Sequence, residues 1–265
     1  MMRNLFLLVI VFLFTSCSQY QKLLKSNDYD LKYEKAMEYY QAEDYTRAGT
    51  LLYELISVFR GTEKAQEAHF AYANSLYGMK DYMLAGHYYK TFIQNYPTNN
   101  LLEECQFMTA YCSYMMSGNP RLDQTETYMA LDALQLFINL YPNSPRAPEA
   151  AYLMDELYDK LAFKAYLNAK LYFDLGTYMG NNYKSAVIVA RNTLDEYPDT
   201  QYREELSFLI LEAKYIQAIK SIEELKNERF RDTLDEYYSF INEFPTSQYL
   251  RKANRFFEVV SERLN

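Results

Sequence analysis

One helical pattern recurs five times along this chain, and each copy ends in an aromatic residue followed by proline or, once, by arginine. The five copies end at Phe59-Arg60, Tyr96-Pro97, Tyr141-Pro142, Tyr197-Pro198 and Phe244-Pro245. A small residue stands at the same distance before each ending, at Ala48, Ala85, Ala130, Ala186 and Thr233. An ordinary amphipathic bundle would show helical periodicity without this shared register. Because a single hairpin cannot bury its own apolar face, the register predicts helical hairpins that stack on their neighbours.

The pattern resembles the second helix of the tetratricopeptide repeat, in which a small residue lets the first helix approach closely and proline ends the hairpin. A first helix can be laid out in the second copy, where the small Ala73 marks the helix crossing. Seven glycines in 265 residues and the absence of β-branched runs favour helix throughout. The predicted fold class is therefore all-α, a right-handed solenoid of about five tetratricopeptide-like hairpins with a C-terminal capping helix.

Residues 1–16 have the features of a secretory signal, because Arg3 precedes an apolar stretch, Leu5–Phe14, that is too short to span a bilayer. Thr15-Ser16-Cys17 follows and resembles a bacterial lipobox, so we expect Cys17 to be the lipid-modified first residue of the mature chain. A plain secreted protein with an incidental cysteine is the alternative. Residues 17–30 are polar and would serve as a tether from the membrane to the repeats.

The repeats divide into two sets in this interpretation. Residues 31–146 would hold repeats one to three, and residues 147–265 would hold a linking helix, repeats four and five and the capping helix. From Arg146 to Leu175 the apolar pattern stays helical, which predicts either one long helix or two helices broken near Phe163. Gln248–Leu264 is expected to cap the end of the stack.

The chain is acidic, with a formal net charge of −8. Removal of the signal takes away one arginine and no acid, so the mature balance is 26 − 35 = −9. This charge argues against nucleic acid or anionic lipid as a partner. Attachment to a membrane would therefore depend on the lipid at Cys17.

Motifs for bond chemistry are absent from the sequence, which contains no HExxH, GxSxG, GxxxxGK or CxxC. His69 is expected to be packed and His87 to be solvated. Cys105 and Cys112 are expected to be small apolar core residues, too far apart on one helix for a disulfide and without metal ligands at recognisable spacing. Pairs of adjacent carboxylates are expected to form solvated helix faces, namely Glu103-Glu104, Asp155-Glu156, Glu204-Glu205 and Glu223-Glu224. No catalytic residue, metal or cofactor is predicted, and an enzyme is not expected.

Nine first-helix positions of repeats one to three are assigned to the groove side of the solenoid when the register of the second repeat is carried onto the first and third. They are Tyr33, Met37, Tyr40, Phe70, Asn74, Tyr77, Phe107, Tyr111 and Tyr114, and we call this set the aromatic wall. Large exposed apolar surfaces mark interaction sites, and rigid aromatic residues with adaptable methionine suit an extended peptide that carries aromatic side chains. The alternative is that the nine residues pack against neighbouring repeats or the chain's own N-terminal segment.

Four stretches together resemble the BamD (YfiO-type) family of outer-membrane assembly lipoproteins over essentially the whole chain. They are the lipobox ending at Cys17, Asp81–Ala85 with Tyr96-Pro97, Ala110-Tyr111-Cys112 with Asp123-Gln124-Thr125, and Ala165–Tyr172. The resemblance implies five hairpins held by a lipid at the periplasmic face of the outer membrane. It also implies two kinds of partner: a BamA-type barrel insertase with other assembly subunits, and unfolded outer-membrane proteins recognised by an aromatic C-terminal signal.

The chain departs from the family pattern at three places. Phe59-Arg60 lacks the proline, Gly176–Asn182 lengthens a turn, and Thr233 replaces the small alanine. We therefore assign no individual insertase-contact residue. The alternative function is a periplasmic scaffold lipoprotein that organises another envelope complex, such as cell-wall enzymes or glycan uptake.

Overall fold

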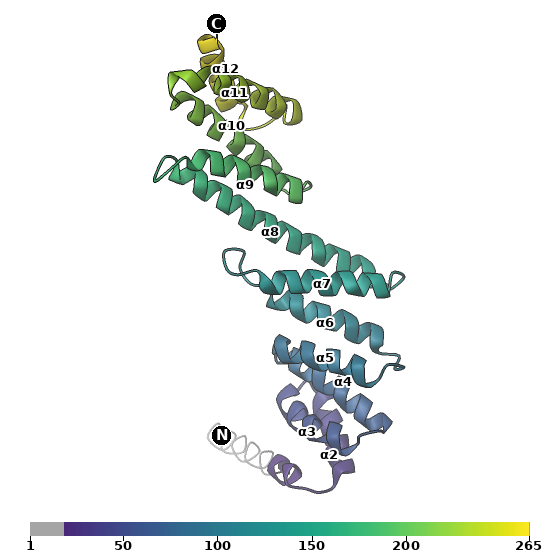
Figure 1. Ribbon diagram of the computed structural model, residues 1–265. Helices are drawn as coiled ribbons and strands as arrows, with labels where there is room; N and C mark the ends of the chain where they lie inside the picture. The colour runs from purple at the N-terminus through teal and green to yellow at the C-terminus, as the bar shows by residue number, and fades with distance from the viewer. Residues whose placement is uncertain (1–18, 265) are drawn as a thin grey trace, which may run out of the picture. The chain divides into compact units, whose positions relative to one another are not determined.

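The fold is all-α over residues 19–264, the part of the chain that the computed structural model describes, and no strand occurs among those residues (Figure 1). The helices are α2 (Tyr29–Gln41), α3 (Tyr45–Val58), α4 (Glu63–Gly78), α5 (Tyr82–Asn95), α6 (Leu102–Met116), α7 (Thr125–Leu140), α8 (Ala147–Leu175), α9 (Asn182–Glu196), α10 (Arg203–Ile219), α11 (Glu223–Glu243) and α12 (Leu250–Leu264). Helices that follow one another pack together, as in the pairs α2–α3, α4–α5, α6–α7 and α10–α11. The predicted all-α stack of tetratricopeptide-like hairpins is confirmed.

Two compact units make up the described chain. Unit 1 holds the described residues up to Gly118 and Thr125–Leu153, and so contains α2–α7 and the start of α8. Unit 2 holds Asn119–Gln124 and the described residues from Met154 onward, and so contains the rest of α8 and α9–α12. Each unit has its own clusters of buried apolar residues.

The small residues of the recurring pattern are core residues. Ala48, Ala85, Ala130, Ala186 and Thr233 are all buried. The residue at the crossing of α5 and α6 is Gly86. A Cβ added there would lie 3.2 Å from the Cβ of Cys112, which is closer than ordinary van der Waals contact. The shared register therefore reflects close helix contacts, as the sequence predicts.

The turn after each aromatic ending is built in the same way in all five repeats. The residue three positions after the aromatic one donates its backbone N–H to the aromatic residue's carbonyl oxygen. These residues are Thr62, Asn99, Ser144, Thr200 and Ser247. In the last four, the side-chain oxygen also accepts the backbone N–H two residues later, at 2.8 to 3.3 Å. Because Asn, Ser and Thr side chains satisfy free backbone groups in turns, each ending leads directly into the next hairpin.

Two of these turns are also tied to an earlier first helix. Ser144 Oγ donates to Glu103 of α6 at 2.6 Å, and Ser247 Oγ donates to Glu204 of α10 at 2.6 Å. Glu103 and Glu204 are therefore half-buried acceptors, and the prediction of solvated faces is wrong for these two residues. The serine hydroxyls compensate the carboxylates for the water that they lose.

Helix α8 is a single unbroken helix of 29 residues, which decides between the two predicted arrangements of residues 146–175. In unit 2 it packs on α9, where the ring centroids of Phe173 and Tyr183 lie 5.6 Å apart. Gly176 follows α8 with φ of 58°, and a Cβ added there would lie 2.8 Å from Tyr183 Oη. Glycine suits this position because of both the left-handed backbone and the limited space. At the other end of the unit, α12 packs on α10 and α11, as expected of a capping helix.

The described chain begins with a short helical segment over residues 19–24. This segment falls within the predicted tether, residues 17–30, yet Tyr20 and Leu23 belong to an apolar cluster of unit 1. Cys17 and residues 1–16 lie outside the described residues, so the roles expected of them stay predictions. Within residues 19–264, no helix combines the length and apolar character needed to cross a bilayer.

Candidate interaction surface

The aromatic wall lies on the first helices of repeats one to three, α2, α4 and α6, all within unit 1. Eight of its nine residues are half-buried, so part of each side chain remains at the surface. Phe107 differs, because its side chain is 1% exposed and packs 5.3 Å from Phe137 of α7 between ring centroids. Phe107 therefore supports the wall from the core and does not present its own ring.

Ring contacts join α4 to α6 along the wall. Tyr77 of α4 lies 6.2 Å from Tyr111 of α6 between ring centroids. Tyr111 also stacks on Phe107 and on Tyr114, at 5.8 and 5.7 Å with interplanar angles of 18° and 25°. Because residues three and four apart share a helix face, these rings form a continuous row.

A hydrogen-bonded chain joins α2, α4 and α5 at the wall. Asn74 Nδ2 donates to Tyr40 Oη at 2.9 Å, and Asn74 Oδ1 accepts the hydroxyl of Tyr89. Tyr89 is 0% exposed, and burial raises the pKa of its hydroxyl. Asn74, the one wall residue that is neither aromatic nor methionine, therefore satisfies a buried hydroxyl.

Basic groups lie near aromatic rings of the wall at two places. Lys64 Nζ is 5.3 Å from the ring centroid of Tyr33, and the Arg146 guanidinium is 4.4 Å from that of Phe107. Both cations also pair with a carboxylate, at 2.6 and 3.0 Å respectively. Cation–π contacts contribute about 0.5 to 2 kcal/mol, so these pairs help to hold the rings in place.

The tyrosine hydroxyls of the wall are suited to hydrogen bonding. Burial raises the pKa of Tyr77, and the nearby Tyr111 and Tyr82 raise it further. Burial and the carboxylate of Glu67 raise the pKa of Tyr33. Both hydroxyls therefore keep their protons at neutral pH. The wall can contact aromatic and aliphatic side chains and donate hydrogen bonds, which is the chemistry of binding.

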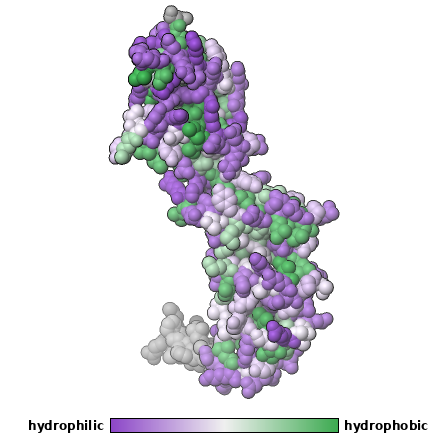
Figure 2. Space-filling model, in the orientation of Figure 1, coloured by the Kyte–Doolittle hydropathy of each residue, from purple (hydrophilic) through white to green (hydrophobic). Residues whose placement is uncertain are grey.

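One face of the molecule can be followed by the hydropathy of its residues in Figure 2. On the face shown in Figure 2, hydrophilic residues predominate and apolar residues form separate patches between them. Such a surface is ordinary for a globular protein. The ring contacts within the aromatic wall run from Tyr77 of α4 to Tyr111, Phe107 and Tyr114 of α6, all in unit 1.

The two histidines lie as the sequence predicts. His69 is buried, and its ring contacts those of Tyr88, Phe92 and Tyr96. Its Nε2 is 3.0 Å from the carbonyl oxygen of Tyr88, to which an Nε2–H would donate. Burial lowers the pKa of His69 and favours the neutral imidazole. His87 is exposed. The packed role of His69 is confirmed.

Cys105 and Cys112 are free and buried. Burial raises the pKa of each thiol to about 12, so neither forms a reactive thiolate at neutral pH. Their predicted role as apolar core residues is confirmed. Across residues 19–264, no group of three or more His, Cys, Asp or Glu side chains is arranged to hold a metal ion.

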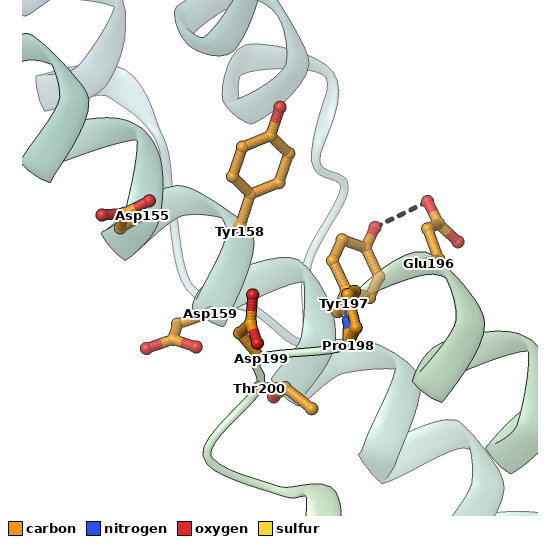
Figure 3. Close-up of a pocket in the computed structure, with 8 residues that line it drawn as sticks. All are labelled: Asp155, Tyr158, Asp159, Glu196, Tyr197, Pro198, Asp199 and Thr200. Carbon is orange, nitrogen blue, oxygen red and sulfur yellow. Dashed lines mark hydrogen bonds between the residues drawn. The ribbon is translucent and has the colours of Figure 1, made fainter.

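A pocket of about 480 Å³ in unit 2 was not predicted from the sequence. It lies between α8 and the turn that joins α9 to α10 (Figure 3). Its lining consists of Asp155, Tyr158, Asp159, Glu196, Tyr197, Pro198, Asp199 and Thr200. Two carboxylates are hydrogen-bonded, since Glu196 accepts from Tyr197 Oη at 2.8 Å and Asp159 accepts from Gln201 Nε2 at 3.3 Å.

The pocket gives no sign of bond chemistry. Its described lining has no histidine, cysteine or lysine, and its carboxylates do not form a metal-binding group. The available sequence signal was the spacing of Asp155 and Asp159, which places both on one helix face. The turn opposite them comes about 40 residues later and could not be placed by that spacing. We assign this pocket no reaction.

Stacked hairpins with this register and this turn define a helical-repeat protein of the tetratricopeptide type. The comparison with protein families is more specific, because the YfiO family of outer membrane lipoproteins matches residues 26–227, which is more than half of the chain. The chain belongs to this family.

Two relatives have names that describe a role. An outer membrane protein assembly factor BamD of Rickettsia prowazekii (strain Madrid E) is 24% identical over 182 residues, which is 69% of this chain and 66% of the relative. A protein of Aquifex aeolicus (strain VF5) that carries the same name provisionally is 26% identical over 200 residues, 74% of this chain and 62% of the relative. The chain thus spans slightly less than two thirds of the length of each.

Proposed function

We propose that this protein is a lipid-anchored scaffold subunit of the machinery that assembles β-barrel proteins in the outer membrane. In this proposal Cys17 carries the lipid, the repeats lie on the periplasmic side, and the protein contributes binding energy and geometry without bond chemistry. The family's description supports an association with the outer membrane, and the names of the relatives support the role in assembly. The observation that carries the proposal is the aromatic wall in a chain of this family.

The proposed partners fall into two groups. A BamA-type barrel insertase and other assembly subunits would bind the repeats, and unfolded outer-membrane proteins would bind the aromatic wall. Eight wall residues keep exposed surface, and the six aromatic ones among them also contact neighbouring rings. Rings that are already held lose little conformational freedom on binding, which favours capture of an aromatic peptide end.

Affinity purification of the full-length protein from detergent-solubilised membranes tests the role in assembly. We expect a β-barrel insertase among the recovered proteins, because a scaffold subunit acts through what it binds. Recovery of cell-wall enzymes or glycan-uptake proteins without an insertase would contradict the proposal and favour the alternative scaffold function.

Replacing Tyr77 and Tyr114 together with alanine tests the wall. We expect the Kd for a peptide that ends in an aromatic residue to rise about tenfold to a hundredfold, or about 1.4 to 2.8 kcal/mol, because aromatic anchors dominate such interfaces. Fluorescence anisotropy with a labelled peptide measures the change.

Tyr128→Ala is the matched control for this experiment. Tyr128 lies on α7, in the same hairpin as Tyr114, and is 53% exposed, but it is not a wall residue. Its replacement should leave the Kd unchanged, and circular dichroism should show equal helix content in all variants. An unchanged Kd for the double variant would show that the wall packs internally and does not bind peptide.

A further inference from the structure

The segment Gln19–Lys25 is docked on the first repeat and is not free. The ring of Tyr20 lies 5.7 Å from that of Tyr39 of α2, edge to face, and its hydroxyl donates to the carbonyl oxygen of Arg47 of α3 at 3.4 Å. The Arg47 guanidinium lies 5.5 Å from the centroids of both rings. Leu23 is buried in the apolar cluster of unit 1, with Leu24 packed beside it. These contacts pack the segment against both α2 and α3.

The docked segment has two chemically different faces. Tyr20, Leu23 and Leu24 are spaced by three and four and form the side that packs on the repeat. Lys22 and Lys25 lie on the opposite side of the helical turn and are exposed. Neither lysine forms an ion pair with a described residue, and no acid occurs between Gln19 and Lys25. In an acidic chain, this segment presents a local basic surface.

The chain length between Cys17 and this segment is very short. Two residue steps separate Cys17 from Gln19, which span at most about 7 Å even when fully extended. If residues 17–27 were all free, the lipid could lie up to about 40 Å from Asp28, the N-cap of α2. Docking of Tyr20 and Leu23 therefore removes most of the reach that the predicted tether would provide.

We propose that the docked segment Gln19–Lys25 holds the first repeat directly against the membrane, with Lys22 and Lys25 in contact with anionic phospholipid headgroups. This inference rests on the lipid anchor at Cys17 in the proposed function. The lipid places the start of the segment at the bilayer surface. Because Tyr20 and Leu23 pack on the first repeat, α2 and α3 are held close to that surface as well. The two lysines add an attraction to anionic lipid that the acidic remainder of the chain lacks.

Fluorescence quenching by headgroup-labelled lipid measures the position of the first repeat. The full-length lipidated protein, in vesicles of phosphatidylethanolamine and phosphatidylglycerol with a spin-labelled headgroup quencher, receives one fluorophore at Thr50→Cys on α3. A second sample carries it at Gln135→Cys on α7. Both positions are exposed, whereas Cys105 and Cys112 are buried with raised thiol pKa values, so labelling is selective. We expect quenching at position 50 to be several-fold stronger than at position 135.

A Tyr20→Ala/Leu23→Ala variant releases the segment while leaving Cys17 and both lysines in place. Quenching at position 50 should fall towards that at position 135, with unchanged helix content and unchanged flotation with the vesicles. Equal quenching at position 50 in the docked and released proteins would overturn the proposal. Failure of the unaltered protein to float would instead refute the lipid anchor, and the purification experiment above tests the assembly role separately.

A charge-reversal variant tests the contact between the two lysines and the lipid headgroups. In a Lys22→Glu/Lys25→Glu variant, quenching at position 50 should fall in vesicles that contain phosphatidylglycerol. It should change little in vesicles of neutral phosphatidylcholine. The same quenching for both proteins in the anionic vesicles would overturn the role of the two lysines.

Discussion

Replacing Phe92 with alanine is expected to lower the free energy of unfolding of unit 1 by about 3 to 5 kcal/mol. Phe92 lies on α5 with 0% of its side chain exposed, and its ring contacts those of His69, Phe70 and Tyr96. Alanine would remove these contacts and leave a cavity that the rings of α4 and of Tyr96 cannot close. Denaturant titration followed by the helical circular dichroism signal measures the loss.

Tyr128→Ala is again the control, since it removes an aromatic ring of unit 1 from an exposed position. Its effect should stay within about 0.5 kcal/mol, as is usual for surface replacements. A cost for Phe92→Ala as small as that of the control would contradict the assignment of Phe92 to a tightly packed core.

Replacing Asn74 with leucine is expected to cost about 1 to 3 kcal/mol, because the hydroxyl of Tyr89 would lose its acceptor while remaining buried. Leucine has a similar size, so the cost would come mainly from the unsatisfied hydroxyl and not from a cavity. The loss of the hydrogen bond to Tyr40 adds less, since Tyr40 is half-buried and can bond to water. The same denaturant titration measures the change.

The double variant Asn74→Leu/Tyr89→Phe separates these causes. Removing both partners of a buried hydrogen bond costs less than removing one, so the double variant should be more stable than Asn74→Leu alone. A cost equal to the sum of the two single replacements would show that the two side chains act independently.

The hairpins could be predicted because their signal is local and repeated. Ala48 and Ala85 occupy the same position in two copies of one pattern, and helix geometry alone places such residues at a crossing. The burial of His69 and Cys112 could be predicted for the same reason, since each lies on the packing side of its helix. The continuity of α8 could not be decided, because the pattern around Phe163 fits one helix as well as two.

The wall and the charged groups show where local patterns stop being informative. The register placed Phe107 with eight half-buried residues, but its own exposure depends on Phe137 of α7 and on Arg146 in the turn before α8. The partial burial of Glu103 likewise depends on a distant residue, because its hydrogen-bond partner Ser144 lies 41 residues away in the sequence. A polar segment that looked like a free tether contains Tyr20 and Leu23, which dock because α2 and α3 offer an apolar surface.

By itself, the sequence determined the repeat register, the all-α fold and the burial of the recurring small residues, because spacing along a helix decides which side chains share a face. Tertiary structure alone decided how much of each wall ring stays exposed, which carboxylates meet at the pocket of unit 2, and that the N-terminal segment docks on the first repeat. These features depend on distances between residues many positions apart, which are set by how helices cross and not by the order of residues within any one of them.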